Sequence, residues 1–311
     1  MIKRLTFTFL LLTFLTACGG AAAAPGVTPT ATPVTAQPSV TPLPATPLPA
    51  TLTAAPGATA TLAPDAWMDL PVVPTSVSQR VKDIYALGQT LGNNPHAFSK
   101  LGDCDTSTTW FLQDFDNTPA AYVLGPYAGL QAVIDYFHGS YGRTSVAAVR
   151  GAVAASMLSP IWNTSPLCLG SESPMACEVR LNHPSFVFVS LGTNDYNFPK
   201  DFEPNMRKIL DSLIAQGIVP ILSTKADDTE GDNSINATIA RLAYEYQLPL
   251  WNFWRAAQPL PDHGLQTDLS HLTFAPNDFT NAADLQAAWP WRNLTALQTL
   301  DVVWRGVTGQ N

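Results

Sequence analysis

The sequence predicts an α/β protein, a three-layer α/β/α sandwich around a mainly parallel five-stranded sheet. Two observations predict it: short apolar runs recur along the chain, and segments with helical spacing lie between them. The expected strands are 97–103, 145–151, 185–192, 218–225 and 248–254. The expected helices are 129–139, 203–217 and 235–247. In such sheets the reactive residues gather in loops beyond the carboxyl ends of the strands.

The three middle strands are almost continuously apolar and rich in Val and Ile, which is typical of central parallel strands. Segment 203–217 is the clearest of the helices. Its apolar residues follow the i, i+3, i+4 spacing of a helix with one buried face: Met206, Ile209, Leu210, Leu213 and Ile214. Gly217 then supplies a stop signal at the end of this helix.

Residues 1–18 have the pattern of a secretory signal peptide. Lys3 and Arg4 precede an uncharged apolar run that is too short to span a bilayer. The run ends in Leu-Thr-Ala-Cys, which resembles the bacterial lipobox and implies that Cys18 is lipidated. The alternative is an ordinary signal peptide that happens to contain a cysteine. The lipobox interpretation predicts a lipid-anchored, extracytoplasmic protein of the bacterial cell envelope, with the membrane as its partner through Cys18.

The next segment, residues 19–66, is expected to be a disordered tether. From Leu5 to Pro64 there is no charged residue, and 19–64 contain ten prolines but no aromatic residue. Such a segment has too little apolar surface to bury. The remainder, 67–311, has the size of one domain.

The charge of the exported chain excludes one class of partner. Removal of the two basic residues of the signal peptide changes the formal charge from 16 − 24 = −8 to 14 − 24 = −10. The rest of the chain has no basic cluster. An acidic chain of this kind is not expected to bind nucleic acid.

The four cysteines divide into three groups. Cys18 is expected to carry lipid, and Cys168 and Cys177, nine positions apart in a loop-like stretch, are the shortest disulfide closure available to an exported chain. Cys104 is left without a partner. A lone cysteine is often simply buried and inert, so the reactivity of Cys104 has to be argued from its surroundings.

Three expected strands end in residues suited to acyl transfer, and a fourth group follows the last strand. The groups are Gly102-Asp103-Cys104, Arg150-Gly151, Gly192-Thr193-Asn194-Asp195 and Asp268-Leu269-Ser270-His271. In this order they resemble the blocks of the GDSL, or SGNH, hydrolase superfamily, over most of residues 95–275. The resemblance implies the flavodoxin-like fold of these hydrolases and an acyl-ester hydrolase, either an esterase or a carbohydrate deacetylase. The sequence departs from the family at position 104, where the first block has serine.

The resemblance also implies a role for each residue. Cys104 takes the position of the nucleophile, His271 that of the base, and Asp268 fixes the tautomer of His271. The backbone N–H groups of Cys104 and Gly151 and the side-chain amide of Asn194 would bind the developing oxyanion. The expected substrate is a small acyl ester or an acylated polysaccharide. No cofactor or metal is expected, and the chain is expected to be a monomer.

Several of these roles have alternatives. Asn194 could cap a turn instead, and His263 competes with His271, although only His271 has an aspartate three residues before it. Asp103 and Asp195 are expected to brace their loops by hydrogen bonds. Four tryptophans could line a glycan site, but packing in the core is the other interpretation. They are Trp110, Trp162, Trp289 and Trp291.

Three interpretations of Cys104 follow. It can be a working thiol nucleophile activated by His271. The domain can instead be inactive, binding a cell-surface or extracellular glycan or acyl group without cleaving it. In the third, Ser107 supplies the hydroxyl, but this residue would lie deeper in the following turn and out of line with the oxyanion donors. The presence of the other site residues favours hydrolysis.

Overall fold

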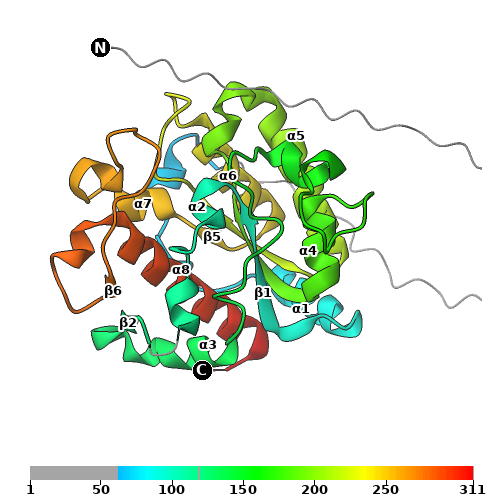
Figure 1. The fold of residues 1–311 in the computed structure, drawn as a ribbon, viewed down its shortest axis with the longest axis horizontal. Coiled ribbons are helices and arrows are strands. Elements are labelled where there is room, and N and C mark those ends of the chain that lie inside the picture. The colour runs from blue at the N-terminus through cyan, green and yellow to red at the C-terminus, as the bar shows by residue number, and fades with distance from the viewer. Residues whose placement is uncertain (1–61, 118–119, 311) are drawn as a thin grey trace, which may run out of the picture. The chain divides into compact units, whose positions relative to one another are not determined.

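The computed structural model describes residues 62–117 and 120–310 (Figure 1). The expected signal peptide with Cys18, and most of the expected tether, lie outside the described residues. The described part begins close to the expected start of the domain. The 3-10 helix η1 (Ala66–Asp69) comes first, and its Trp67 is buried against Trp254, with 4.8 Å between the ring centroids.

The chain is an α/β protein with a four-stranded parallel sheet flanked by helices (Figure 1). The strand order is β1 (Asn94–Gly102), β3 (Pro184–Ser190), β4 (Val219–Ser223) and β5 (Leu250–Trp251). Every residue of β3 and β4 is buried, as the apolar runs predict. The register pairs Gly102 with Ser190, so β1 and β3 end side by side.

The expected strand 145–151 forms a single bridge. Ala148 pairs in parallel with Gly102. The contact is made by Gly102 N–H donating to Ala147 O and Val149 N–H donating to Gly102 O, both at 3.0 Å. Pairing is limited to this bridge because residues 145–148 form a turn, in which Ala148 N–H donates to Ser145 O at 3.3 Å, and because β1 ends at Gly102. The segment therefore ends beside β1, as predicted, although it is too short to count as a strand.

The last expected strand, 248–254, is also shorter than predicted. Only Leu250 and Trp251 are extended, and helix α7 (Phe253–Ala257) follows directly. Asn252 caps this helix by accepting a hydrogen bond from Arg255 N–H at 3.3 Å. The apolar run is therefore divided at Asn252, with a short strand before this residue and a helix after it.

The helices differ widely in how clearly the sequence marks them. The α-helices not yet given are α1 (Gln79–Thr90), α2 (Cys104–Ser107), α3 (Gln131–Tyr136), α4 (Pro174–Asn182), α5 (Pro199–Ala215), α6 (Ser234–Tyr246) and α8 (Ala288–Thr308). The remaining 3-10 helices are η2 (Gln113–Asp116), η3 (Gly125–Leu130), η4 (Ala154–Leu158), η5 (Pro160–Trp162), η6 (Thr193–Asn197), η7 (Pro261–Gly264) and η8 (Asp284–Gln286). Among the described helices none is both long and apolar enough to cross a membrane.

Helix α5 confirms the predicted amphipathic stripe. Its five apolar residues, from Met206 to Ile214, are all buried, and Gly217 follows at φ +66°. Helix α8 was not predicted. It has 21 residues and lies buried over most of its surface, where it contacts α1, α3 and α7. A second, two-stranded parallel sheet of β2 (Tyr122–Val123) and β6 (Asn277–Asp278) was not predicted either.

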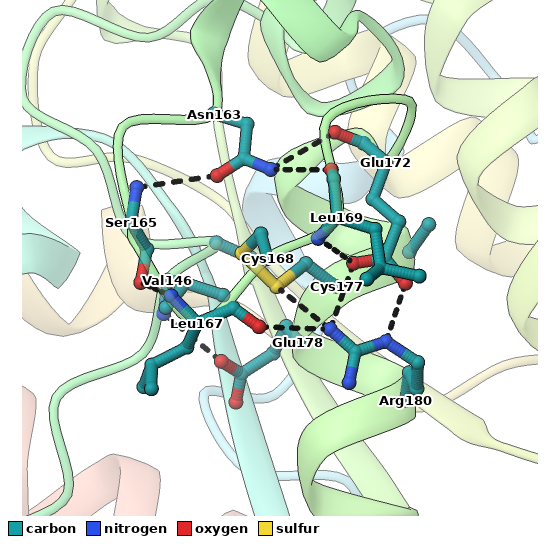
Figure 2. Close-up of a disulfide and its surroundings, with 12 residues drawn as sticks. Val146, Asn163, Ser165, Leu167, Cys168, Leu169, Glu172, Cys177, Glu178 and Arg180 are labelled. Atoms are coloured by element: carbon teal, nitrogen blue, oxygen red, sulfur yellow. Dashed lines mark hydrogen bonds and ion pairs between the residues drawn. A yellow bond between two sulfur atoms is a disulfide. The ribbon is translucent and has the colours of Figure 1, made fainter. Parts of the chain in front are cut away.

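The structure contains the predicted Cys168–Cys177 disulfide, with the two Cα atoms 5.3 Å apart. Figure 2 shows the surroundings of this bond, where Arg180 of α4 meets the loop that precedes the helix. Arg180 forms an ion pair with Glu172 at 2.5 Å and donates a hydrogen bond to Leu167 O at 3.0 Å. The loop is thus tied to α4 by one covalent bond and by these polar contacts.

Candidate active site

The site begins where β1 ends. Asp103 caps the one-turn helix α2 by accepting a hydrogen bond from Asp105 N–H at 3.3 Å, and Cys104 is the first residue of this helix. Gly102 is required before this turn, because a Cβ here would overlap both Ser190 O and the side chain of Thr106. The tight turn places Cys104 at the carboxyl end of the sheet.

Cys104 is the free cysteine of the described chain, and it is partly exposed. Its Sγ accepts a hydrogen bond from Gly151 N–H at 3.3 Å. The expected nucleophile and one expected oxyanion donor are therefore in contact, although 47 residues separate them in the sequence. Gly151 has a φ of +73°, a conformation that favours glycine at this position.

Asn194 and Asp195 lie in η6, directly after β3. The Asn194 side-chain amide donates to Ala152 O at 3.2 Å, so it contacts the same loop that carries Gly151. The Asp195 carboxylate accepts a hydrogen bond from Ala154 N–H at 3.0 Å, which ties the end of this loop to η6. Burial raises the pKa of Asp195 to about 6, and the Ala154 N–H opposes this rise.

His271 and Asp268 form the pair that their spacing predicts. His271 Nδ1 lies 2.7 Å from Asp268 Oδ2, while Asp268 Oδ1 accepts hydrogen bonds from the backbone N–H groups of His271 at 3.0 Å and Ser270 at 3.1 Å. These bonds, led by the His271 backbone N–H, lower the pKa of Asp268 to about 2. Because Nδ1 is engaged by the carboxylate, Nε2 is the ring nitrogen left to act as a base.

Cys104 and His271 line one open pocket. The rest of its lining comes from the turn after β1, the loop of Gly151, the loop 264–274 and the start of α8. These residues are Asp105, Ser107, Thr108, Arg150, Gln266, Leu272, Phe274 and Trp289. His263 does not contribute to this pocket, and its Nδ1 lies 3.0 Å from Gln258 O. Ser107 does line the pocket, but its hydroxyl donates to Cys104 O at 3.1 Å.

A second, smaller cavity adjoins this pocket, and Asp105 lines both. Asp103 and Arg292 also line the cavity. Arg292 is 3% exposed, and its Nε has no hydrogen-bond partner among the described residues. Its guanidinium lies over the rings of Phe111 at 4.8 Å and Trp251 at 5.0 Å from the centroids.

The charges of Asp103, Asp105 and Arg292 influence one another. Burial raises the pKa of Asp105 to about 6, and the nearby Arg292 guanidinium opposes this rise. Burial also raises the pKa of Asp103. Sequence reasoning missed Arg292, Asp105 and Phe274 as residues of the site. A charged residue inside the otherwise apolar stretch Trp289-Pro290-Trp291-Arg292 was the one available signal for the arginine.

One group of side chains among the described residues has the spacing of a metal site. It consists of Cys168, Glu172 and Cys177. Both sulfur atoms are joined in the disulfide, and Glu172 is paired with Arg180. The group therefore has no thiolate to offer as a metal ligand.

Comparison with known proteins does not place the chain in a family. No protein-family model matches it, and no curated protein matches it. The function has to be argued from the chemistry of the site itself.

Proposed function

We propose that the chain is an exported acyl-ester hydrolase of the SGNH type, anchored to the membrane by lipid on Cys18. One observation carries the hydrolase proposal: Cys104 and His271 line the same pocket, and His271 is held through Nδ1 by Asp268 at 2.7 Å. A nucleophile, a base and a group that orients the base are the parts that acyl transfer needs.

The proposed fold fits this assignment. The bridge between Gly102 and Ala148 lies on the side of β1 opposite β3, where a fifth strand of a flavodoxin-like sheet would run. With that strand included, the sheet becomes the centre of the three-layer sandwich that the sequence predicts. The carboxyl ends of the strands then carry Cys104, Gly151 and Asn194, as the general rule for ligand sites in such sheets requires.

The proposed reaction has two steps. Cys104 Sγ attacks the ester carbonyl while His271 Nε2 accepts the thiol proton, and the negative charge develops on the carbonyl oxygen. That charge would be met by the backbone N–H groups of Cys104 and Gly151 and by the Asn194 amide. Collapse releases the alcohol, which takes the proton from His271, and leaves an acyl thioester on Cys104. Water, activated by His271, then releases the carboxylic acid and restores the thiol.

The Gly151 N–H is central to this proposal, because it already points at the reacting atom. It donates to Cys104 Sγ at 3.3 Å. Asn194 now donates one amide hydrogen to Ala152 O, which leaves its second hydrogen for substrate. Loss of a single oxyanion donor generally costs about 3 kcal/mol, or a factor of roughly a hundred or more in rate.

The alternative function is binding without hydrolysis. The observation that favours it is the cysteine at position 104, because a site built around a serine hydroxyl need not turn over a thioester. In that case the pocket would hold a glycan or acyl group at the cell surface. The two functions are distinguished by ester turnover in two chains. The hydrolase function predicts turnover in the wild type, whereas the binding function predicts that turnover appears only when Cys104 is replaced by serine.

The test is ester hydrolysis by the full chain, purified in detergent, with p-nitrophenyl acetate as substrate. We expect turnover that iodoacetamide abolishes, and that Cys104→Ala and His271→Ala each reduce by at least about a thousandfold. His263→Ala is the matched control, since His263 lies outside the pocket, and it should retain full activity. Absence of turnover in the wild type, with turnover created by Cys104→Ser, would establish the binding function instead. Detergent phase partitioning of the chain beside a Cys18→Ala variant tests the anchor.

A further inference from the structure

Two aromatic rings lie exposed beside the pocket. Trp110 is 43% exposed and Phe274 is 52% exposed, and their ring centroids are 4.7 Å apart with 55° between the planes. The Phe274 ring also stacks on Trp289 at 6.3 Å with 21° between the planes. Large aromatic side chains usually bury most of their surface, so an exposed pair at the edge of a pocket indicates a binding surface.

One ring of the pair, Phe274, belongs to the pocket wall, and the other packs against it. Phe274 and Trp289 line the pocket together with Cys104 and His271, and Trp110 extends the aromatic surface outward from Phe274. A ligand that contacts Phe274 from within the pocket therefore shares that pocket with the proposed nucleophile.

The backbone beneath the rings is fixed by hydrogen bonds. Asn293 of α8 donates to Trp110 O at 2.9 Å. The residue before Phe274 is held on both sides, since Thr273 N–H donates to Gly264 O at 2.8 Å and Trp289 N–H donates to Thr273 O at 3.1 Å. The exposed rings are thus presented by ordered backbone, which lowers the entropic cost of binding a ligand.

The polar residues of the pocket indicate what the ligand is. Ser107, Thr108, Arg150 and Gln266 also line the pocket. The side chains of Ser107, Thr108 and Gln266 already make hydrogen bonds within the protein, whereas Arg150 makes no hydrogen bond or ion pair to the residues that the structure describes. A long aliphatic chain would remove the Arg150 guanidinium from water without offering it a hydrogen bond, which is costly. A pyranose ring has a face of C–H groups and a rim of hydroxyls, and it satisfies both kinds of wall.

We propose that Trp110 and Phe274, whose ring planes are tilted by 55°, form an aromatic platform that contacts a sugar ring, so that the ester cleaved at Cys104 is carried by a carbohydrate. The substrate class is therefore an acylated polysaccharide or oligosaccharide. This inference rests on the proposed hydrolase function, but sugar binding can be measured without turnover.

The first measurement is binding to the inactive full-length Cys104→Ala variant by affinity gel electrophoresis. The probes are acetylated xylan, acetylated glucomannan and partially acetylated chitosan. We expect at least one of them to retard the protein, and a second substitution, Trp110→Ala, to weaken the binding about tenfold. Trp110→Phe should keep part of the affinity. Tyr244→Ala is the matched control, because Tyr244 is 44% exposed on α6 and contributes nothing to the pocket, so it should bind as tightly as the parent variant.

The second measurement compares substrates in chains that retain Cys104. Trp110→Ala should lower kcat/KM for the carbohydrate that binds by about tenfold more than for p-nitrophenyl acetate. If p-nitrophenyl acetate is hydrolysed but none of the three polysaccharides binds, the platform is wrong while the hydrolase function stands. If Trp110→Ala instead acts mainly on p-nitrophenyl octanoate, the rings bind the acyl chain and the carbohydrate assignment is overturned. Carbohydrate binding that depends on Trp110, with no ester turnover at all, supports the platform and rejects hydrolysis.

Discussion

At the scale of single residues, the contact between His271 and Asp268 is the most specific feature of the site. Asp268 accepts three hydrogen bonds, and all of them come from within its own four-residue turn. The backbone bonds fix the carboxylate, and the carboxylate fixes the ring. Because these bonds lower the pKa of Asp268 to about 2, the carboxylate stays ionised at every pH above about 4. A loss of activity at acidic pH would therefore report the protonation of groups other than Asp268.

Replacement of Asp268 by asparagine should reduce kcat for p-nitrophenyl acetate by at least about a hundredfold. The amide no longer fixes the His271 tautomer as the carboxylate does. The measurement is steady-state kinetics across pH 5 to 9. Asp262→Asn, next to the uninvolved His263, is the control and should retain activity. Equal rates for Asp268→Asn and the wild type would show that the carboxylate does not orient the base.

At the same scale, the sequence indicates some members of the site and hides others. Asp268 and His271 are three residues apart, so their contact is local and can be read from spacing. The contact of Cys104 with Gly151 spans 47 residues and depends on how two strand ends meet. Arg292 could not be predicted as a site residue, because the rings around it come from the segment after α2, from β5 and from α7, which meet only in the folded chain.

At the scale of elements, predictability follows periodicity. Helix α5 was predicted because one face is buried and the other is exposed to solvent, and this difference produces a clear stripe of apolar residues in the sequence. Helix α8 was missed because it is buried on most sides, so its sequence has no polar face to show the helical period. Pro290 lies in its first turn, where proline is compatible with a helix. The expected strand 145–151 is reduced to one bridge, because its apolar run does not reveal the turn at residues 145–148.

Two glycines connect separate elements and set the position of α1. Gly88 in α1 lies against Gly217, which follows α5, and a Cβ on Gly88 would overlap the carbonyl oxygen of Gly217. Asn93 reinforces this junction by donating to Gly217 O at 3.2 Å. The close approach therefore requires glycine at both positions.

Gly88→Ala should destabilise the chain by roughly 1–3 kcal/mol, because the backbone has to move to admit the methyl group. Helix propensity alone predicts the opposite sign, a gain of about 1 kcal/mol for alanine over glycine. The measurement is the midpoint of urea unfolding. Gly129→Ala is the matched control, since its Cβ would meet nothing within 4 Å. An unchanged or raised midpoint for Gly88→Ala would contradict the close packing of α1 on the Gly217 turn.

At the scale of the whole molecule, buried carboxyl groups couple the site to stability. Burial raises the pKa of Asp105 and of Asp195 to about 6 each. Such a group holds its proton more tightly in the folded chain than in the unfolded one. As pH rises from about 4 to about 6, the unfolded chain loses this proton first, so the free energy of unfolding falls and stays lower above pH 6. Each group contributes at most on the order of 3 kcal/mol.

Two other carboxyl groups have the opposite effect in a different range. Hydrogen bonds lower the pKa of Asp268 to about 2, and hydrogen bonding by Arg241 lowers that of Glu203 to about 2. Their stabilisation is complete above the unfolded pKa near 4 and is lost as pH falls toward 2. The two effects together place the greatest stability between about pH 4 and 5.

We therefore expect the melting temperature of the chain to be roughly 5 °C lower at pH 7 than at pH 5. Asp105→Asn should raise the melting temperature at pH 7 and reduce this difference, because a neutral amide has no charge to bury at the edge of the pocket. Asp65→Asn, at an exposed carboxyl group, is the control and should leave the difference unchanged. Differential scanning calorimetry at matched ionic strength measures all three chains. A wild-type melting temperature that rises from pH 5 to pH 7 would show that the two buried carboxyl groups carry no such penalty. If the expected penalty is observed, the stability lost at Asp105 is a cost of building the site. The carboxyl group of Asp105, next to Cys104 in the sequence, lines both the pocket and the cavity of Arg292.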